Sequence, residues 1–264
     1  MCGIAGYSFS PHSGVDRTLA AQALLAGIAE RGADAVGYAY RSPGESTPLV
    51  TKQRTPASML LERIDVPDAA GELLVHVRDY TKGHPSIAAN NHPIRHGPVV
   101  GIHNGIIVND DELLAPHGCA RTEARMTVDS EAIFAVAAHS RNDGRAFEDL
   151  RGSMAAAWLD EREPDALHLA RGVGRPLWLG ESREGAFFAS TERALEIVGR
   201  YCGVSLRRRE VREGTLLVLD RGKVARRDRF RAPEYIESDP LPAVRAPAER
   251  DVCLRRLAVL AAIA

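Results

Sequence analysis

The spacing of apolar residues along the chain predicts many short strands and a few helices. Apolar runs alternate with turn-forming Gly, Pro, Asn and Asp, which is typical of β-strands joined by short loops. We predict strands over residues 4–9, 37–40, 48–52, 72–78, 99–103, 154–159, 166–170, 176–180, 185–190, 214–220 and 222–224, helices over 19–30, 129–139, 191–198 and 249–264, and a loop over 80–98. Because the strands do not strictly alternate with helices, the pattern indicates an α+β fold with largely antiparallel sheets.

The pattern changes after about residue 230. Proline recurs between residues 232 and 248, which predicts an extended linker. Residues 249–264 then have the composition of a short helix, which either packs back on its own domain or contacts a partner. We therefore expect one main domain over residues 2–230, and a Pro-rich linker with a short C-terminal helix over residues 231–264.

Composition and charge exclude several classes of protein. The 264 residues carry a formal net charge of -1, so no global field favours nucleic acid or an acidic membrane. The longest apolar runs fall short of the ~18–20 residues that cross a bilayer, and the N-terminus lacks a secretory pattern, so we expect a cytoplasmic protein. The cysteines are far apart and form no CxxC pair, which argues against a disulfide framework or structural zinc: Cys2, Cys119, Cys202 and Cys253.

The second residue is a candidate nucleophile. If Met1 is removed, Cys2 becomes the N-terminus and carries both a thiol and a free α-amine. An α-amine titrates near pH ~8, so it is a base already placed beside its nucleophile. A chance cysteine at a frayed terminus is the alternative, and the rest of the chain must decide between them.

Other polar clusters stand where the predicted strands end. Arg78 closes one strand, and His103-Asn104-Gly105 closes another. Asp129 begins a predicted helix, where an aspartate also serves as an N-cap. His92, His96 and His103 lack an acidic or cysteine ligand at useful spacing, so we do not expect a metal site.

Taken in order, these clusters resemble the class II glutamine amidotransferase domain, an N-terminal-nucleophile hydrolase. The likeness covers roughly residues 2–220 and is greatest to the glutaminase halves of glucosamine-6-phosphate synthase and amidophosphoribosyltransferase. Six clusters carry it: Cys2-Gly3-Ile4, Arg31 to Gly37, His76 to Thr81, Asn90 to Pro93, His103 to Ile106, and Asp129-Ser130-Glu131.

The resemblance implies a four-layer αββα sandwich and a glutaminase domain over residues 2–230. It implies hydrolysis of the L-glutamine side-chain amide through a Cys2 thioester, with the Asn104 side chain and the Gly105 N–H holding the oxyanion. It assigns the substrate to Arg78, Thr81, Lys82, His92 and Asp129, with Arg31 and His103 bracing the site from behind. Arg78 suits the carboxylate and Asp129 the ammonium group of glutamine. This chemistry needs no metal or organic cofactor.

Two departures from the family pattern leave alternatives open. Asp79 stands where aromatic residues are usual; its carboxylate is expected to compete for Arg78, and Lys82 to offset that charge. Since no synthase sequence follows the linker, we expect ammonia to pass to a separate acceptor subunit, with the 249–264 helix as a candidate contact. The rival hypotheses are an N-terminal-nucleophile amidohydrolase acting on another small amide, and a glutamine-binding regulatory subunit without turnover.

Overall fold

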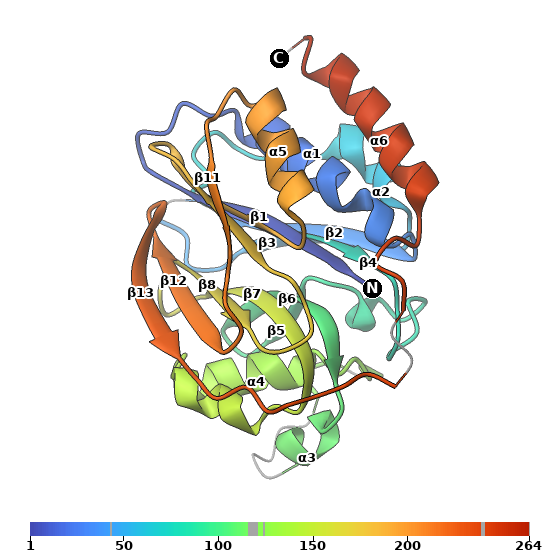
Figure 1. Ribbon diagram of the computed structural model, residues 1–264, viewed down its shortest axis with the longest axis vertical. Helices are drawn as coiled ribbons and strands as arrows, with labels where there is room; N and C mark the ends of the chain where they lie inside the picture. The colour runs from blue at the N-terminus through green and yellow to red at the C-terminus, as the bar shows by residue number, and fades with distance from the viewer. Residues whose placement is uncertain (43, 116–120, 124, 239–240, 264) are drawn as a thin grey trace.

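The structure, a computed structural model, describes residues 1–42, 44–115, 121–123, 125–238 and 241–263. Two antiparallel sheets pack face to face at its centre (Figure 1). In the described residues the first sheet has seven strands, in the spatial order β11 (Arg207–Glu210), β9 (Trp178–Glu181), β10 (Gly185–Ala189), β1 (Gly3–Phe9), β4 (Glu72–Arg78), β2 (Ala35–Arg41) and β3 (Leu49–Gln53). The second has six there, in the order β13 (Lys223–Arg229), β12 (Thr215–Asp220), β8 (Ala166–Arg171), β7 (Gly152–Asp160), β6 (Val99–Ile107) and β5 (Ile94–His96).

Helices cover the outer face of each sheet (Figure 1). The helices over the first sheet are α1 (Arg17–Ile28), α2 (Ala57–Leu60), α5 (Glu192–Tyr201) and α6 (Pro247–Leu260). On the second sheet lies α4 (Glu131–Ser140), with α3 (Asp110–Leu114) beside it. Short 3₁₀ turns occupy Ala29–Arg31, Leu61–Arg63, Ala88–Asn90 and Gly144–Asp149.

Three apolar layers hold these four layers of secondary structure together. Successive residues of a strand point to opposite faces, so Phe187 packs against the helices while Phe188 packs between the sheets. Phe134 of α4 and Trp158 of β7 are both fully buried in the third layer, outside the second sheet. The predicted four-layer αββα arrangement with antiparallel sheets is confirmed.

Strand β1 lies in the middle of the first sheet, between β10 and β4. Its register pairs Gly3 with Val77 and Ala5 with Ala189, and every residue of the strand is buried. The start of the chain is therefore anchored in the sheet and does not fray, and it lies beside the end of β4. Because β1 is anchored, Cys2, which directly precedes it, has a defined place in the fold.

The structure adds short elements that the sequence pattern did not predict. Strand β5 lies inside the predicted loop 80–98, and α2 and α3 have only four and five residues. Strand β11 has the sequence Arg-Arg-Arg-Glu, without any apolar residue. Such elements are too short to show a hydrophobic period, and their neighbours in the fold decide their conformation.

The C-terminal part runs back across the molecule before it forms α6 (Figure 1). Helix α6 packs on α1 and α2 through Cys253 and Leu257, both fully buried, and Arg250 forms an ion pair of 2.5 Å with Glu30. The helix thus packs on its own domain, one of the two alternatives. Residues 239, 240 and 264 of the predicted linker and helix lie outside the described residues, as does Cys119. No helix in the described part of the chain combines the length and apolarity that a bilayer crossing requires.

Candidate active site

Cys2, Arg78 and Asn104 come together because β1 starts where β4 ends, and β6 of the facing sheet packs against both strands. A small cavity of about 10 Å³ lies at this point. The predicted site residues that line it are Cys2, Arg78, Thr81, Lys82, His92, His103, Gly105 and Asp129. Two of the predicted residues stand just behind that lining: Asn104, which is fully buried, and Arg31.

The Cys2 side chain lies against the end of β4. Its thiol donates to the backbone oxygen of Asp79 over 3.4 Å, and Arg31 Nε donates to the Cys2 carbonyl oxygen over 2.8 Å. Burial raises the pKa of the thiol, while the Asp79 backbone contact and the Arg78 charge oppose that shift. With Met1 in place, the terminal ammonium belongs to Met1 and pairs with the Asp79 carboxylate. Arg31 therefore holds the backbone of Cys2 in place.

Asn104 holds an amide group with no protein partner. The residue is fully buried, and neither Nδ2 nor Oδ1 forms a hydrogen bond with any described residue. Leaving a buried polar group unsatisfied costs about 1–3 kcal/mol, so folding alone does not explain this side chain. An amide in this condition can donate to an oxygen that a ligand brings.

The next residue, Gly105, has a backbone conformation that only glycine adopts without strain. Its φ is +145°, and a Cβ atom there would lie 1.9 Å from the Ser153 carbonyl oxygen. The residue lines the cavity itself. Its lack of a side chain lets the main chain come this close to β7 and to the cavity.

Arg78 is 2% exposed, and its guanidinium is committed to the loop that follows it. Nη1 donates to Asn91 Oδ1 over 2.6 Å, and Nη2 donates to the Lys82 carbonyl oxygen over 2.9 Å and to that of Gly83. Arg78 therefore holds the loop after β4 in place while it lines the cavity. Asn91 was part of a recognised motif, but its contact with Arg78 was not predicted.

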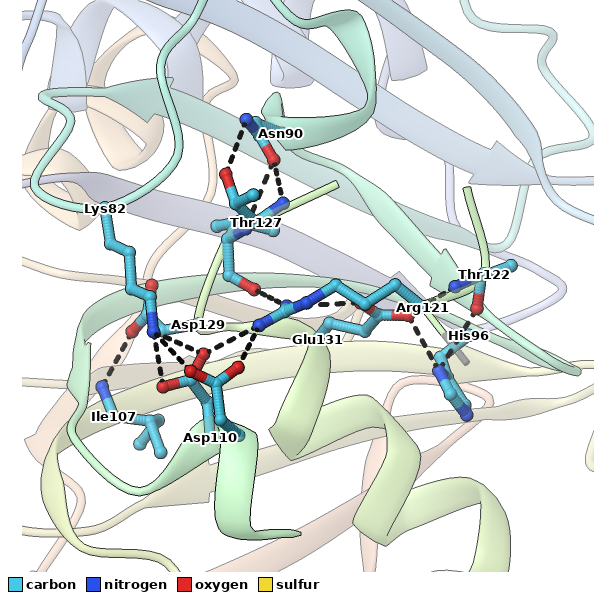
Figure 2. Close-up of polar contacts among 12 residues, drawn as sticks. Lys82, Asn90, His96, Ile107, Asp110, Arg121, Thr122, Thr127, Asp129 and Glu131 are labelled. Atoms are coloured by element: carbon cyan, nitrogen blue, oxygen red, sulfur yellow. Dashed lines mark hydrogen bonds and ion pairs between the residues drawn. The ribbon is translucent and has the colours of Figure 1, made fainter. Parts of the chain in front are cut away.

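Lys82 and Asp129 lie beside other charged residues, of which Asp110 is buried (Figure 2). Lys82 Nζ lies 2.7 Å from both carboxylate oxygens of Asp110, which also accepts from Arg121 Nη2 at 3.0 Å. Asp129 Oδ2 accepts from the Ile107 backbone N–H at 2.7 Å. Burial raises the pKa of Asp129 to about 6, and the nearby Asp110 charge adds to the shift. Asp110 and Arg121 were missed because neither belongs to a recognised motif.

The histidines near the cavity are neutral. Burial lowers the pKa of His103 to about 3 and the pKa of His92 well below its usual value. His103 Nδ1 lies 2.8 Å from Ser130 Oγ, whereas His92 stacks on His76 with the ring centres 4.3 Å apart. Imidazoles held neutral in this way are poor proton carriers at neutral pH. The described residues contain no cluster of His, Cys, Asp or Glu suited to a metal ion.

Asp79 does not take the part expected from its sequence position. Its carboxylate points to the Met1 ammonium and to Arg245 Nε, at 3.3 Å, while its contacts with Arg78 and Lys82 do not form. The competition for Arg78 that was expected of Asp79 is therefore not found in this structure, and Lys82, which was expected to offset the Asp79 charge, pairs with Asp110. Arg245 comes from the C-terminal segment, 166 residues further along, and no local signal in the sequence pointed to it.

Comparison with known proteins shows what the chain is similar to. Residues 81–196 match a family profile described as a glutamine amidotransferase domain. The chain is 30% identical over 212 residues to glutamine–fructose-6-phosphate aminotransferase (isomerizing) of Acidithiobacillus ferridurans, and 31% identical over 213 residues to that of Shigella flexneri. Each match covers 76% of this chain and 33% of the relative, so the chain spans about a third of the length of these curated relatives.

Solved structures share the fold. The glutamine phosphoribosylpyrophosphate amidotransferase of B. subtilis superposes with a TM-score of 0.68 at 18% identity, over 86% of this chain and 49% of that one. A structure described as the allosteric regulatory enzyme of purine biosynthesis gives 0.66 at 17% identity, with the same coverage. At these identities the superpositions establish the fold, and the sequence matches establish the relationship. The chain is therefore related to glutamine amidotransferases: residues 81–196 match their domain profile, and the fold is that of the solved amidotransferase.

Proposed function

We propose that this domain hydrolyses the side-chain amide of L-glutamine and releases glutamate and ammonia, with Cys2 as the nucleophile once Met1 is removed. One observation carries the proposal: the unpartnered, buried amide of Asn104 and the cavity-lining Gly105 stand on the strand that faces the start of β1. A binding protein would need neither a nucleophile nor a pair of donors for an oxyanion.

The proposed reaction uses groups that the chain already places near the cavity. The Cys2 thiolate adds to the amide carbon, and the carbonyl oxygen becomes an oxyanion that accepts from Asn104 Nδ2 and the Gly105 N–H. The α-amine of Cys2 carries the thiol proton to the leaving nitrogen, because the nearby histidines are held neutral. Ammonia departs and leaves a thioester. Water then attacks the thioester, the sulfur leaves, and glutamate is released.

Recognition of glutamine is proposed for the charged half of the cavity. Arg78 offers a planar fork to the α-carboxylate, with Thr81, Lys82 and His92 around it. Asp129 accepts the α-ammonium group. Because Arg78 and Lys82 already have internal partners, glutamine must replace contacts to Asn91, to loop carbonyls or to Asp110. The loop after β4 is expected to adjust as the substrate binds.

The released ammonia is proposed to go to an acceptor enzyme. The matched relatives are named as aminotransferases that use glutamine, and this chain spans 33% of their length. We propose that the acceptor is a separate subunit that binds near the cavity. Its identity depends on residues of the partner and not on those of the glutaminase site.

The first experiment is intact-mass analysis before and after treatment with diazo-oxo-norleucine, an alkylating analogue of glutamine. Loss of Met1 and a single adduct on Cys2, blocked by excess L-glutamine, is the expected result. The Cys2→Ala variant is the control and should form no adduct. A processed chain whose Cys2 stays unmodified would overturn the proposal. An adduct that glutamine does not block would indicate another amide as the substrate.

A further inference from the structure

Arginines point into the space between the two sheets at one of its edges. Strands β11 and β13 are the edge strands of their sheets on the same side of the molecule (Figure 1). Both strands are rich in arginine, and some of these side chains stand on the faces that elsewhere hold the apolar layer between the sheets. The register of the strands identifies which ones.

On β13 the inward positions are Arg227 and Arg229. Arg227 pairs with Leu217 of β12, and Arg229 pairs with Thr215. Leu217 belongs to the apolar cluster between the sheets. Because directly opposed residues of antiparallel strands share a face, both arginines stand on the inward face.

On β11 the inward positions are Arg207 and Arg209. Arg209 pairs with Leu179 of β9, which also belongs to the cluster between the sheets. Arg209, Arg227 and Arg229 come from two different sheets and border a common space. Apolar residues fill the same layer further inside.

These side chains border a groove of about 520 Å³, a size suited to a small ligand. Its lining includes the buried residues Val211, Thr215 and Leu217, while Arg209, Arg212, Arg227 and Arg229 supply the charge. Glu210 is the one acidic residue in the described lining. None of these residues lines the cavity around Cys2, so the groove is a separate site.

The positive charge of the groove is only partly neutralised. Arg209 forms an ion pair with Glu181 at 3.1 Å, and Glu210 forms one with Arg171 at 2.8 Å. Arg229 donates to the neutral Thr215 hydroxyl. Neither Arg212 nor Arg227 forms an ion pair with any described residue. Converging like charges repel one another, and an anion between them would remove that repulsion.

The outward arginines of the same strands behave differently. Arg208 of β11 pairs with Glu192 at 3.2 Å, and Arg226 of β13 pairs with Asp228 at 2.9 Å. Charged edge strands protect a sheet from pairing with another chain, and paired outward arginines serve that purpose well. Protection of a sheet edge does not require several arginines without an acidic partner to face the same groove.

We propose that this groove binds a small molecule with two or more phosphate groups. Guanidinium groups suit phosphate because they donate in a planar, bidentate fashion. More than one phosphate is indicated because the uncompensated arginines come from separate positions, Arg212 before β12 and Arg227 and Arg229 on β13. The apolar Val211 and Leu217 leave room for an uncharged part of the ligand.

The test is isothermal titration calorimetry of the full chain with inorganic pyrophosphate, and with sulfate and an acidic peptide for comparison. The groove variant is Arg227→Gln with Arg229→Gln. The matched control, Arg208→Gln with Arg226→Gln, removes the same charge from the outward faces of the edge strands. We expect pyrophosphate to bind more tightly than sulfate, and the groove variant to bind it at least about tenfold more weakly while the control keeps wild-type affinity.

Several outcomes would overturn the proposal. Pyrophosphate binding no tighter than sulfate binding would show that the groove has no phosphate site. Equal weakening in both double variants would show only the effect of net charge. Tighter binding of the acidic peptide than of pyrophosphate would assign the groove to a protein partner. The comparison of ligands on the wild-type chain decides the question even if the groove variant folds poorly.

Discussion

The two halves of the cavity around Cys2 differ in how their polar groups are satisfied. In the half proposed for chemistry, the Asn104 amide is buried without a protein partner. In the half proposed for recognition, Arg78 and Lys82 already form contacts with Asn91, loop carbonyls and Asp110. The first half is thus ready to donate a new hydrogen bond, and the second must exchange existing ones.

This difference indicates which half should govern substrate binding and which half should govern the rate of the chemical step. A donor that is already desolvated and fixed acts on the transition state without reorganising. A cation that must first leave an internal partner contributes less to substrate binding. Its contribution is the free energy of the new contact with the substrate minus that of the internal contact it loses. We therefore expect substitutions in the first half to change kcat and substitutions in the second half to change KM.

The largest effect is expected for Asn104→Ala. Loss of one oxyanion donor should lower kcat by about 10²–10³-fold and leave KM nearly unchanged. Because the variant removes an unsatisfied buried amide, Tm should hold or rise. Steady-state glutamate release and thermal melts measure both. A large rise in KM with normal kcat would place Asn104 in recognition and break the comparison.

Arg78→Lys should change KM, in contrast to Asn104→Ala, which should change kcat. Lysine keeps the positive charge but loses the fork, so KM for glutamine should rise by about tenfold to a hundredfold, with kcat within a few-fold of wild type. The same kinetic assay measures it, and thermal melts check the contact with Asn91. An effect confined to kcat would contradict the assignment to recognition.

The raised pKa of Asp129 predicts that glutamine binding in the recognition half depends on pH. Burial raises this pKa to about 6, so the carboxylate that should hold the glutamine ammonium forms only as pH rises through that value. Glutamine should therefore bind about tenfold more weakly at pH 5 than at pH 7.5, measured by titration of the inert Cys2→Ala variant. The same raised pKa favours protonated Asp129 in the fold, so its contribution to stability is full below about pH 4 and is lost as pH rises past 6. An Asp129→Asn background should bind weakly with no such pH dependence, and a persisting dependence would point to another group.

The smallest effect is expected for Arg245→Ala. Its ion pair with Asp79 is partly exposed, with 45% of the Arg245 side chain accessible. Such pairs contribute about 0–1 kcal/mol, so Tm and kcat/KM should change only slightly. The substitution tests whether the C-terminal segment affects the cavity, and the far-side Arg183→Ala variant is its control. A change in kcat/KM of about a hundredfold would show that this segment belongs to the site.

Much of the fold could be predicted because its elements are long and periodic. Strands β4 and β7 and helix α4 have apolar patterns that the sequence shows directly. Strand β11 and helix α3 could not be found in this way, since one is wholly charged and the other has five residues. Their conformation depends on neighbours that are distant in sequence.

For the site, local motifs identified Cys2, Arg78, Asn104, Gly105 and Asp129, and the structure brings them to one place. The partners of these residues could not be predicted. Asp110 pairs with both Lys82 and Arg121, which come from separate elements (Figure 2), and its charge also acts on Asp129. Asp79 was expected to disturb Arg78, and its carboxylate turns instead to Met1 and Arg245.

The sequence by itself determined the residue types, the order of the motifs and the periodicity of the main elements. Periodicity indicated an α+β fold, and the resemblance carried by the motifs implied the αββα sandwich. The tertiary structure alone decided which charges are neutralised. An ion pair or a buried amide depends on distances of a few ångströms between segments that can be more than a hundred residues apart, and one-dimensional spacing does not contain those distances. For the same reason, the arginines of β11 and β13 look alike in the sequence, while the fold directs some of them outward to carboxylates and others into a common groove.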